Sequence, residues 1–339
     1  NPKFEAVYTS PNGKHKGIQT SVKLSSTLPG AFYGILPSRL TSVVAVTFKV
    51  PIGAFYYSRK FVAKLVSAEK YKKDAPLTDP NAMRQFLLRS TGPEITKAFK
   101  AKPELAKVRD SRGMPPMGMA ILTGAVGNVK ALEAAGLKLT GPYPNKLTAL
   151  HLACDSSVEM ITYVKSKLPT WTKDAQGYNP LFHAIYSIQP TNLKALSPTK
   201  KQLAEKCGPY SNTALHAAVS LGSLSMIKTL MQFGPDPNAL NVYGEPPIAS
   251  SYRMPTDTID KMITLIKPSL SVKIGKEKHS LLHYAVVGNK WKAVPALMKH
   301  GLNPRTKNGE GKDCFDLLQS IDHPVNRAQM KRLLEGKKT

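Results

Sequence analysis

The chain has 339 residues, of which 48 are Lys or Arg and 22 are Asp or Glu, so its formal net charge is +26. A hydrophobic fraction of 42% with only 23 glycines excludes wholesale disorder, collagen and a multi-span membrane protein. At about 150 residues per domain, the length predicts one large or two modest domains. The three cysteines, Cys154, Cys207 and Cys314, are odd in number and lie more than fifty residues apart, so neither a disulfide framework nor a CxxC metal knuckle can be read from them. This favours a reducing or organellar compartment over secretion.

Residues 1–70 are predicted to form a basic N-terminal arm. No acidic residue occurs between Ala6 and Ala68, and β-branched and aromatic residues are clustered in residues 31–61, as in strands. Acid-poor basic leaders resemble organellar transit peptides, which are normally removed. The sequence begins with Asn rather than Met, so it is either a processed product or part of a longer chain. Because a transit peptide would already be removed, we interpret the arm as mature sequence.

Residues 40–57 of this arm carry a single charge, that of Lys49. The length of this segment lies within the window for a bilayer span, and the basic flanks suit interfacial anchoring. The flanks are Arg39, Arg59 and Lys60. A lysine in mid-segment opposes insertion by about 2.5–3.5 kcal/mol. Two alternatives stay open: a single membrane anchor, or an extended arm or small β element packed on a partner.

An internal repeat follows a predicted helical linker at residues 71–104. Its clearest copies, at 148–153, 213–218 and 280–285, read TALHLA, TALHAA and SLLHYA. An aliphatic or aromatic anchor recurs at nearly constant spacing in successive copies. These anchors are Met117, Leu150, Leu181, Leu215, Ile248, Leu282 and Phe315. Glycines recur four residues before anchors, at 113, 177, 244 and 311, and nineteen residues after them, at 136, 234 and 301.

These motifs resemble the ankyrin repeat, whose signature is Thr-Pro-Leu-His-x-Ala with a period of about 33 residues. The resemblance covers residues 105–325 and implies a mainly α fold, an ankyrin-type α-solenoid of stacked helix pairs with hairpin loops. Residues 326–339 would then be a basic C-terminal cap or tail, with Lys331 and Arg332 facing solvent.

Two copies depart from the pattern. In the third copy Phe182 replaces the signature histidine, and we expect Pro190 and Pro198 to interrupt its second helix. In the fifth copy Pro255 follows Ile248 closely, so we expect its first helix to be short or displaced.

Catalytic arrangements are missing from the sequence. It contains no phosphate-binding GxxxxGK with Ser or Thr, no GxGxxG after a strand, no HExxH and no GxSxG. The resemblance implies that His151, His216 and His283 are structural hydrogen bonders near turns and not metal ligands. We therefore expect no enzyme, no cofactor, no metal and no small-molecule substrate.

Cationic residues gather at the predicted hairpin tips and nearby loops. If the repeats stack, they form a basic stripe that suits a polyanion: nucleic acid, anionic lipid or an acidic protein. They are Arg109, Arg112, Lys146, Lys273, Lys276, Lys278, Arg305 and Lys307. The alternative is that the charge merely reflects an organelle whose soluble proteins are basic.

The sequence thus predicts a non-catalytic scaffold that is a structural subunit of a large organellar assembly, most concretely a mitochondrial ribosome-like ribonucleoprotein. Its partners would be other protein subunits and ribosomal or other RNA. The mitochondrion is the expected location, with plastid or cytoplasm as alternatives. Two other functions stay open: an accessory subunit of an organellar membrane complex of bioenergetics anchored by residues 40–57, or an ankyrin adaptor for an acidic protein.

Overall fold

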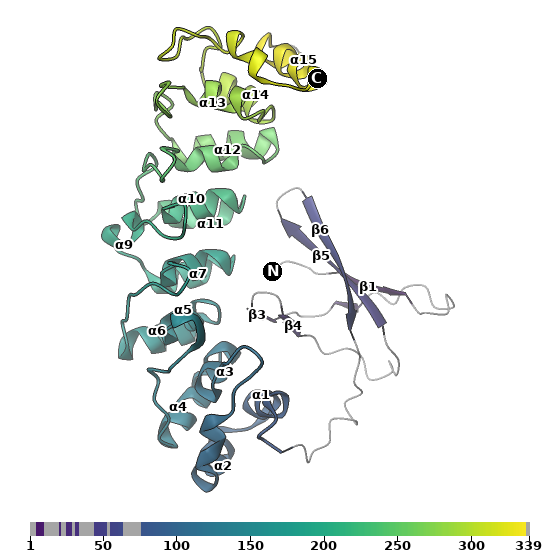
Figure 1. The fold of residues 1–339 in the computed structure, drawn as a ribbon. Coiled ribbons are helices and arrows are strands. Elements are labelled where there is room, and N and C mark those ends of the chain that lie inside the picture. The colour runs from purple at the N-terminus through teal and green to yellow at the C-terminus, as the bar shows by residue number, and fades with distance from the viewer. Residues whose placement is uncertain are drawn as a thin grey trace. The chain divides into compact units, whose positions relative to one another are not determined.

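The computed structural model describes residues 76–336 and the six strands that precede them. The chain divides into two units, Asn1–Ala175 and Gln176–Thr339, and Figure 1 shows the elements of both. Helices make up nearly all of the regular structure between residues 76 and 336, whereas the last of the six strands ends at Ala63.

The strands pair in an antiparallel manner. One sheet has the order β2-β1-β5-β6, and β3 pairs with β4. Their bounds are β1 (Glu5–Thr9), β2 (Thr20–Ser21), β3 (Ser25–Leu28), β4 (Ala31–Tyr33), β5 (Val44–Ile52) and β6 (Phe55–Ala63). In the longest pairing, Val44 lies opposite Ala63 and Ile52 opposite Phe55.

The segment 40–57, considered above as a membrane anchor, overlaps β5 and the start of β6. Its described part therefore forms two paired strands and not one continuous helix. Within the described residues, no helix combines the length and the apolar character that crossing a bilayer requires. Of the predicted basic flanks, Arg59 and Lys60 belong to β6, and Arg39 lies outside the described residues.

The helical part of the first unit consists of three helix pairs. Their bounds are α1 (Pro80–Arg89), α2 (Gly92–Ala101), α3 (Pro116–Thr123), α4 (Val126–Ala134), α5 (Ala149–Cys154) and α6 (Val158–Lys167), with short 3-10 turns η1 (Pro103–Lys107) and η2 (Pro144–Lys146). α1 packs on α3 and α2 packs on α4. The residues predicted as a helical linker therefore add a further pair to the stack, through fully buried Leu87 and Ile95.

The second unit repeats the same plan of successive helix pairs. Its elements are α7 (Pro180–Tyr186), α8 (Pro190–Leu196), α9 (Lys200–Ala204), α10 (Ala214–Ser220), α11 (Leu224–Met231), η3 (Pro247–Ser251), α12 (Thr256–Ile266), α13 (Leu281–Val287), α14 (Ala293–Lys299), η4 (Asp316–Ser320) and α15 (Pro324–Leu334). First helices pack on first helices, as α7 does on α10, and second helices on second helices, as α11 does on α12. The expected mainly α, ankyrin-type stacking is confirmed.

The predicted anchors explain this packing. From Met117 to Leu282, each anchor lies at the second position of its helix and is at most 3% exposed. Phe315 is the exception, because it is partly exposed and precedes η4, while the neighbouring Cys314 is fully buried. Both glycine positions also agree with the prediction, since these glycines have positive φ, which side chains disfavour.

The two irregular copies behave differently from each other. Pro190 does not interrupt the second helix of the third copy, as predicted, but begins it, because a first-turn proline lacks an N–H that the helix would leave unpaired anyway. That helix ends at Ser197, in a left-handed conformation, just before Pro198. In the fifth copy the short first helix is confirmed as the five-residue η3.

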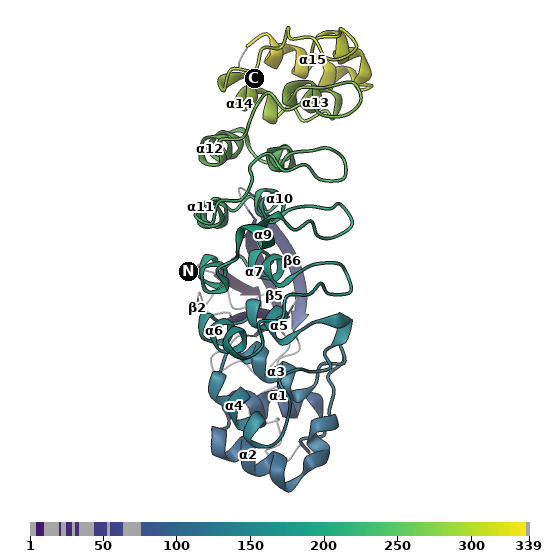
Figure 2. The same cartoon turned by 90° about the vertical axis from the view of Figure 1, so that its left-hand side faces the viewer.

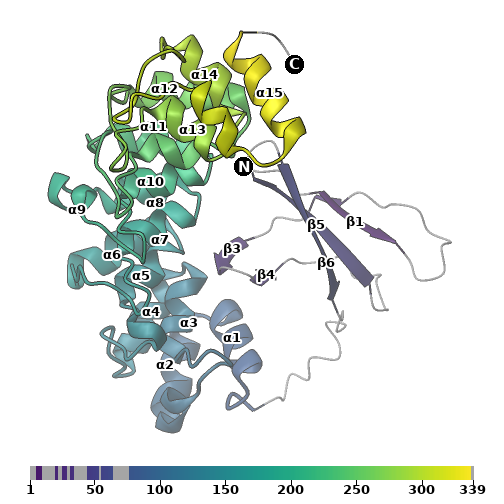
Figure 3. The ribbon, with the colours of Figure 1, turned by 45° about the horizontal axis from the view of Figure 1, so that its top comes forward.

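The C-terminal helix α15 closes the second unit. It packs on α14 (Figure 3) through buried Met330, Leu333 and Leu334. Lys331 and Arg332 are exposed, as predicted.

Candidate functional site

Histidines stabilise the base of the hairpins. The Nδ1 atom of His216 lies 2.8 Å from Thr213 Oγ1 and accepts the Thr213 backbone N–H, while its Nε2 lies 2.9 Å from the carbonyl oxygen of Glu245 in the next hairpin. His283 repeats this arrangement with Ser280 and with the carbonyl of Lys312, at 2.6 and 3.2 Å. Burial lowers the pKa of both histidines. The predicted structural role is confirmed.

Buried Asn and Asp side chains shape the hairpin tips. Asn241 Oδ1 accepts the backbone N–H groups of Tyr243 and Glu245, at 2.9 and 3.1 Å. Asn308 and Asp110 form the same turn in their own hairpins. Sequence reasoning missed these residues, although each stands seven residues before an anchor and three before a turn glycine.

Backbone hydrogen bonds link successive tips within the second unit. Val242 N donates to Tyr210 O at 3.1 Å, and Gly309 N donates to Glu277 O at 2.6 Å. The hairpin loops consequently project along one side of the helices (Figure 2). These bonds fix the positions of successive tips relative to one another, and therefore the sequence in which their side chains follow along the surface.

The predicted cations of the first unit have different surroundings. Arg109 is exposed but donates to the carbonyl oxygens of Ala106 and Val108, both at 2.8 Å. Arg112 lies 3.9 Å from Asp110, whose carboxylate also pairs with Arg84 at 2.6 Å. Lys146 is exposed and forms no ion pair among the described residues.

In the second unit, Arg305 and Lys307 are held by acidic neighbours. Arg305 Nη1 lies 3.2 Å from Asp313 Oδ2, and Lys307 Nζ lies 3.1 Å from Asp316 Oδ2. Burial raises the pKa of Asp313, but backbone N–H donors and Arg305 outweigh it and leave the pKa below its usual value. These cations are therefore partly neutralised.

Lys273, Lys276 and Lys278 remain available. All three are exposed in the hairpin that the Ile274–His279 bridge closes, and within residues 76–336 none forms an ion pair. The structure thus places these three predicted cations on one tip.

Apolar side chains dominate the two preceding tips. Tyr210, Val242 and Tyr243 are 52%, 60% and 60% exposed, and the two tyrosine rings lie 5.9 Å apart between centroids. Sequence reasoning missed them, yet both tyrosines stand five residues before an anchor, at the same position of successive hairpins. We call the exposed set on these three successive hairpins the tip surface: Tyr210, Val242, Tyr243, Lys273, Lys276 and Lys278.

The chain is similar to known ankyrin-repeat sequences and structures. A family model described as ankyrin repeat matches residues 210–242. The chain is 33% identical to part of the Drosophila melanogaster transient receptor potential channel pyrexia and 26% identical to part of human palmitoyltransferase ZDHHC17. These matches cover 28% and 38% of this chain but only 10% and 26% of the relatives.

Among solved structures, the human ASB11 ankyrin repeat domain superposes with a TM-score of 0.51 at 21% identity, over 64% of this chain and 97% of that domain. At this identity, the likeness concerns the fold.

Proposed function

We propose that this ankyrin-repeat protein is a scaffold that recruits an acidic partner protein through the tip surface, and that it does so as a structural subunit of a large organellar assembly. Its repeats are of a type that typically mediates protein–protein interaction without catalysis. The observation that carries the proposal is the exposed Tyr210, Val242 and Tyr243 beside three exposed lysines that form no ion pair within residues 76–336.

The chemistry of the tip surface suits a protein partner. Tyrosines supply large contact area with little side-chain entropy to lose, and they are enriched in the centres of interfaces. Lys273, Lys276 and Lys278 flank this centre, where they would steer an acidic surface and accelerate its association. The expected partner therefore offers an apolar recess bordered by carboxylates.

The net charge of +26 favours a second contact, with RNA. Exposed lysines such as Lys146 neutralise phosphates without reading bases, so this contact would be independent of sequence and sensitive to salt. On this basis we propose a ribonucleoprotein of the mitochondrion, similar to its ribosome, as the assembly.

Sedimentation of the native protein from a detergent-solubilised mitochondrial extract tests the assembly. We expect it to migrate with a heavy particle, and to leave that particle after ribonuclease treatment. Mass spectrometry of the co-migrating proteins identifies the subunits. Migration as a monomer, or a particle that resists both ribonuclease and raised salt, would contradict the ribonucleoprotein.

Two variants test the tip surface itself. Replacing Tyr210 and Tyr243 by Ser should remove the partner protein from the particle, whereas replacing Lys273, Lys276 and Lys278 by Gln should slow association and reduce its salt dependence. Matched controls are Val325→Ser, 68% exposed on α15, and a triple Gln variant of exposed lysines on second helices, Lys194, Lys228 and Lys261. Equal retention of all variants would contradict the assignment.

A further inference from the structure

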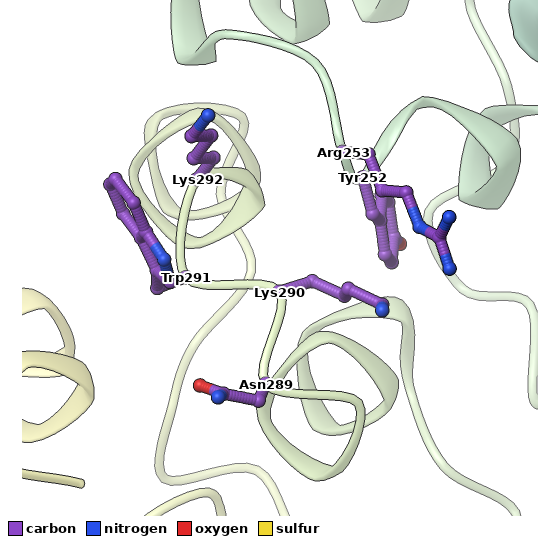
Figure 4. A pocket seen from close by; sticks show the side chains of 6 residues that line it. All are labelled: Tyr252, Arg253, Asn289, Lys290, Trp291 and Lys292. Atoms are coloured by element: carbon purple, nitrogen blue, oxygen red, sulfur yellow. The ribbon is translucent and has the colours of Figure 1, made fainter. Parts of the chain in front are cut away.

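A pocket of about 220 Å³ opens at the far end of α13 from its hairpin. It lies between the residues that follow η3 and the turn that joins α13 to α14 (Figure 4). Its lining consists of Tyr252, Arg253, Asn289, Lys290, Trp291 and Lys292. The lining thus contains three cations, two aromatic rings and no acidic residue.

The backbone on both sides of the pocket is fixed. Tyr252 is 3% exposed and its hydroxyl donates to Leu281 O at 3.2 Å, which holds the adjacent Arg253 at the pocket. On the other side, α13 ends at Val287 with Gly288 as its C-cap. The next residue, Asn289, lies in the left-handed region at φ 51°, and Lys290 N donates to Ala285 O at 2.7 Å. Such a cap leaves the Lys290 backbone little freedom.

From these positions, the side chains of Arg253 and Lys290 point toward each other, as Figure 4 shows. Neither forms an ion pair or a hydrogen bond through its charged group with any residue of the described part. The ammonium of Lys292 lies 5.4 Å from the Trp291 ring centroid and points away from Arg253 and Lys290 in Figure 4. Like charges that face each other repel, so an anion between them would be stabilised by both.

We propose that this pocket binds a phosphate monoester group. A monoester carries close to two negative charges at neutral pH, which matches the Arg253 and Lys290 pair better than a carboxylate or phosphodiester. The guanidinium of Arg253 offers two parallel donors to phosphate oxygens, and Lys290 adds a point charge. The volume of about 220 Å³ is smaller than the roughly 300–1,000 Å³ typical of sites for drug-sized ligands, and it suits a phosphate group.

Fluorescence of Trp291 provides a direct readout. The chain has two tryptophans, so Trp171→Phe in the full-length protein leaves Trp291 as the reporter. At constant ionic strength, we expect a saturable change with inorganic phosphate and with phosphoserine, and a weaker response to dimethyl phosphate. Tighter binding of phosphoserine than of inorganic phosphate indicates a phosphorylated partner, whereas the reverse indicates free phosphate.

Substitutions decide whether the pocket is the site. Arg253→Gln and Lys290→Gln should each weaken phosphate binding about tenfold, because each removes a hydrogen bond to a charged group. The phosphate affinity of Arg253→Lys should lie between those of the parent and of Arg253→Gln, because lysine keeps the charge but lacks the two parallel N–H donors of the guanidinium. Lys261→Gln, on the exposed side of α12, should bind as the parent does.

A further control separates this pocket from the tip surface. Changing Lys273, Lys276 and Lys278 to Gln should leave the phosphate affinity in the same assay unchanged. A response that is linear in concentration and equal for chloride would overturn the proposal. So would unchanged affinity in Arg253→Gln and Lys290→Gln proteins whose circular dichroism matches that of the parent.

Discussion

The repeats that carry a histidine and those that lack one begin their first helices in different ways. In α10 and α13, a Thr or Ser and a His cap the helix reciprocally, and the His Nε2 also reaches the next hairpin. In α7, the position of the signature histidine holds Phe182, which is fully buried. Asn179 caps this helix alone, and its amide donates to Glu205 at 2.7 Å. η3 has no side-chain cap.

The hairpin base can therefore be secured either by hydrogen bonds or by packing. Phe182 lies 5.4 Å from Tyr178 and 6.2 Å from Tyr186 between ring centroids, so aromatic contacts replace the imidazole there. Beside η3, the Glu245 side chain accepts hydrogen bonds from the Asn241 amide and from the Tyr284 hydroxyl, which ties this hairpin to α13. We therefore expect substitutions and low pH to change the stability of the histidine-capped hairpins and of the aromatic-packed hairpin to different extents.

The largest loss of stability is expected at the hairpin that Phe182 secures by aromatic packing. Phe182→Ala should lower the free energy of unfolding by about 3–5 kcal/mol, because it removes a fully buried ring and leaves a cavity. Urea unfolding followed by circular dichroism measures it, with Phe182→Leu as the milder reference. A loss below that of the Leu variant would show that the ring does not secure the hairpin.

A smaller loss is expected at a polar tip. Asn241→Ala leaves the N–H groups of Tyr243 and Glu245 without their acceptor, which should cost on the order of 2 kcal/mol. Asn241→Asp keeps the accepting oxygen but loses the amide that donates to Glu245 and Asn212, so it should recover only part of the stability. If Asn241→Ala unfolds at the same urea concentration as the parent, the turn does not depend on this acceptor.

Between pH 7.5 and pH 5.5, acid should weaken the repeats that His216 and His283 cap. Burial lowers the pKa of His216 and His283, so the folded state favours their neutral forms. Their contribution is complete above the unfolded pKa of about 6.5 and is lost as pH falls toward the folded pKa, with a slope of at most about 1.4 kcal/mol per pH unit for each histidine. We expect a lower free energy of unfolding at pH 5.5 than at pH 7.5, by about 1 kcal/mol.

A double His216→Gln and His283→Gln variant provides the control for that titration. It should be less stable than the parent at pH 7.5, because the caps are weakened, and its stability should change less with pH. An unaltered slope would assign the pH dependence to other groups.

The smallest effect on stability is expected on the tip surface. Changing Lys273, Lys276 and Lys278 to Gln should alter the free energy of unfolding by less than about 0.5 kcal/mol for each, because all three are exposed and without an acidic partner in the described part. A clear gain in stability would show that their mutual repulsion strains the hairpin.

Much of the repeat could be predicted from the sequence because its signals are local. The Thr148 and His151 cap and the turn at Gly244 depend on residues a few positions apart. The prediction for Pro190 was wrong, since a proline alone does not tell whether it ends one helix or begins the next. Arg305 and Lys307 could not be told from Lys276 because their acidic partners became evident only in the fold.

The period, the anchors and the turn glycines can be read from the amino-acid sequence alone, since they follow from helix capping and backbone sterics over short distances. It took the packed structure to show that α1 and α2 join the stack, that Tyr210 lies beside Tyr243, and that Arg253 faces Lys290. Each of these contacts joins residues of different repeats. Their partners are chosen by packing between helix pairs, which no local pattern encodes.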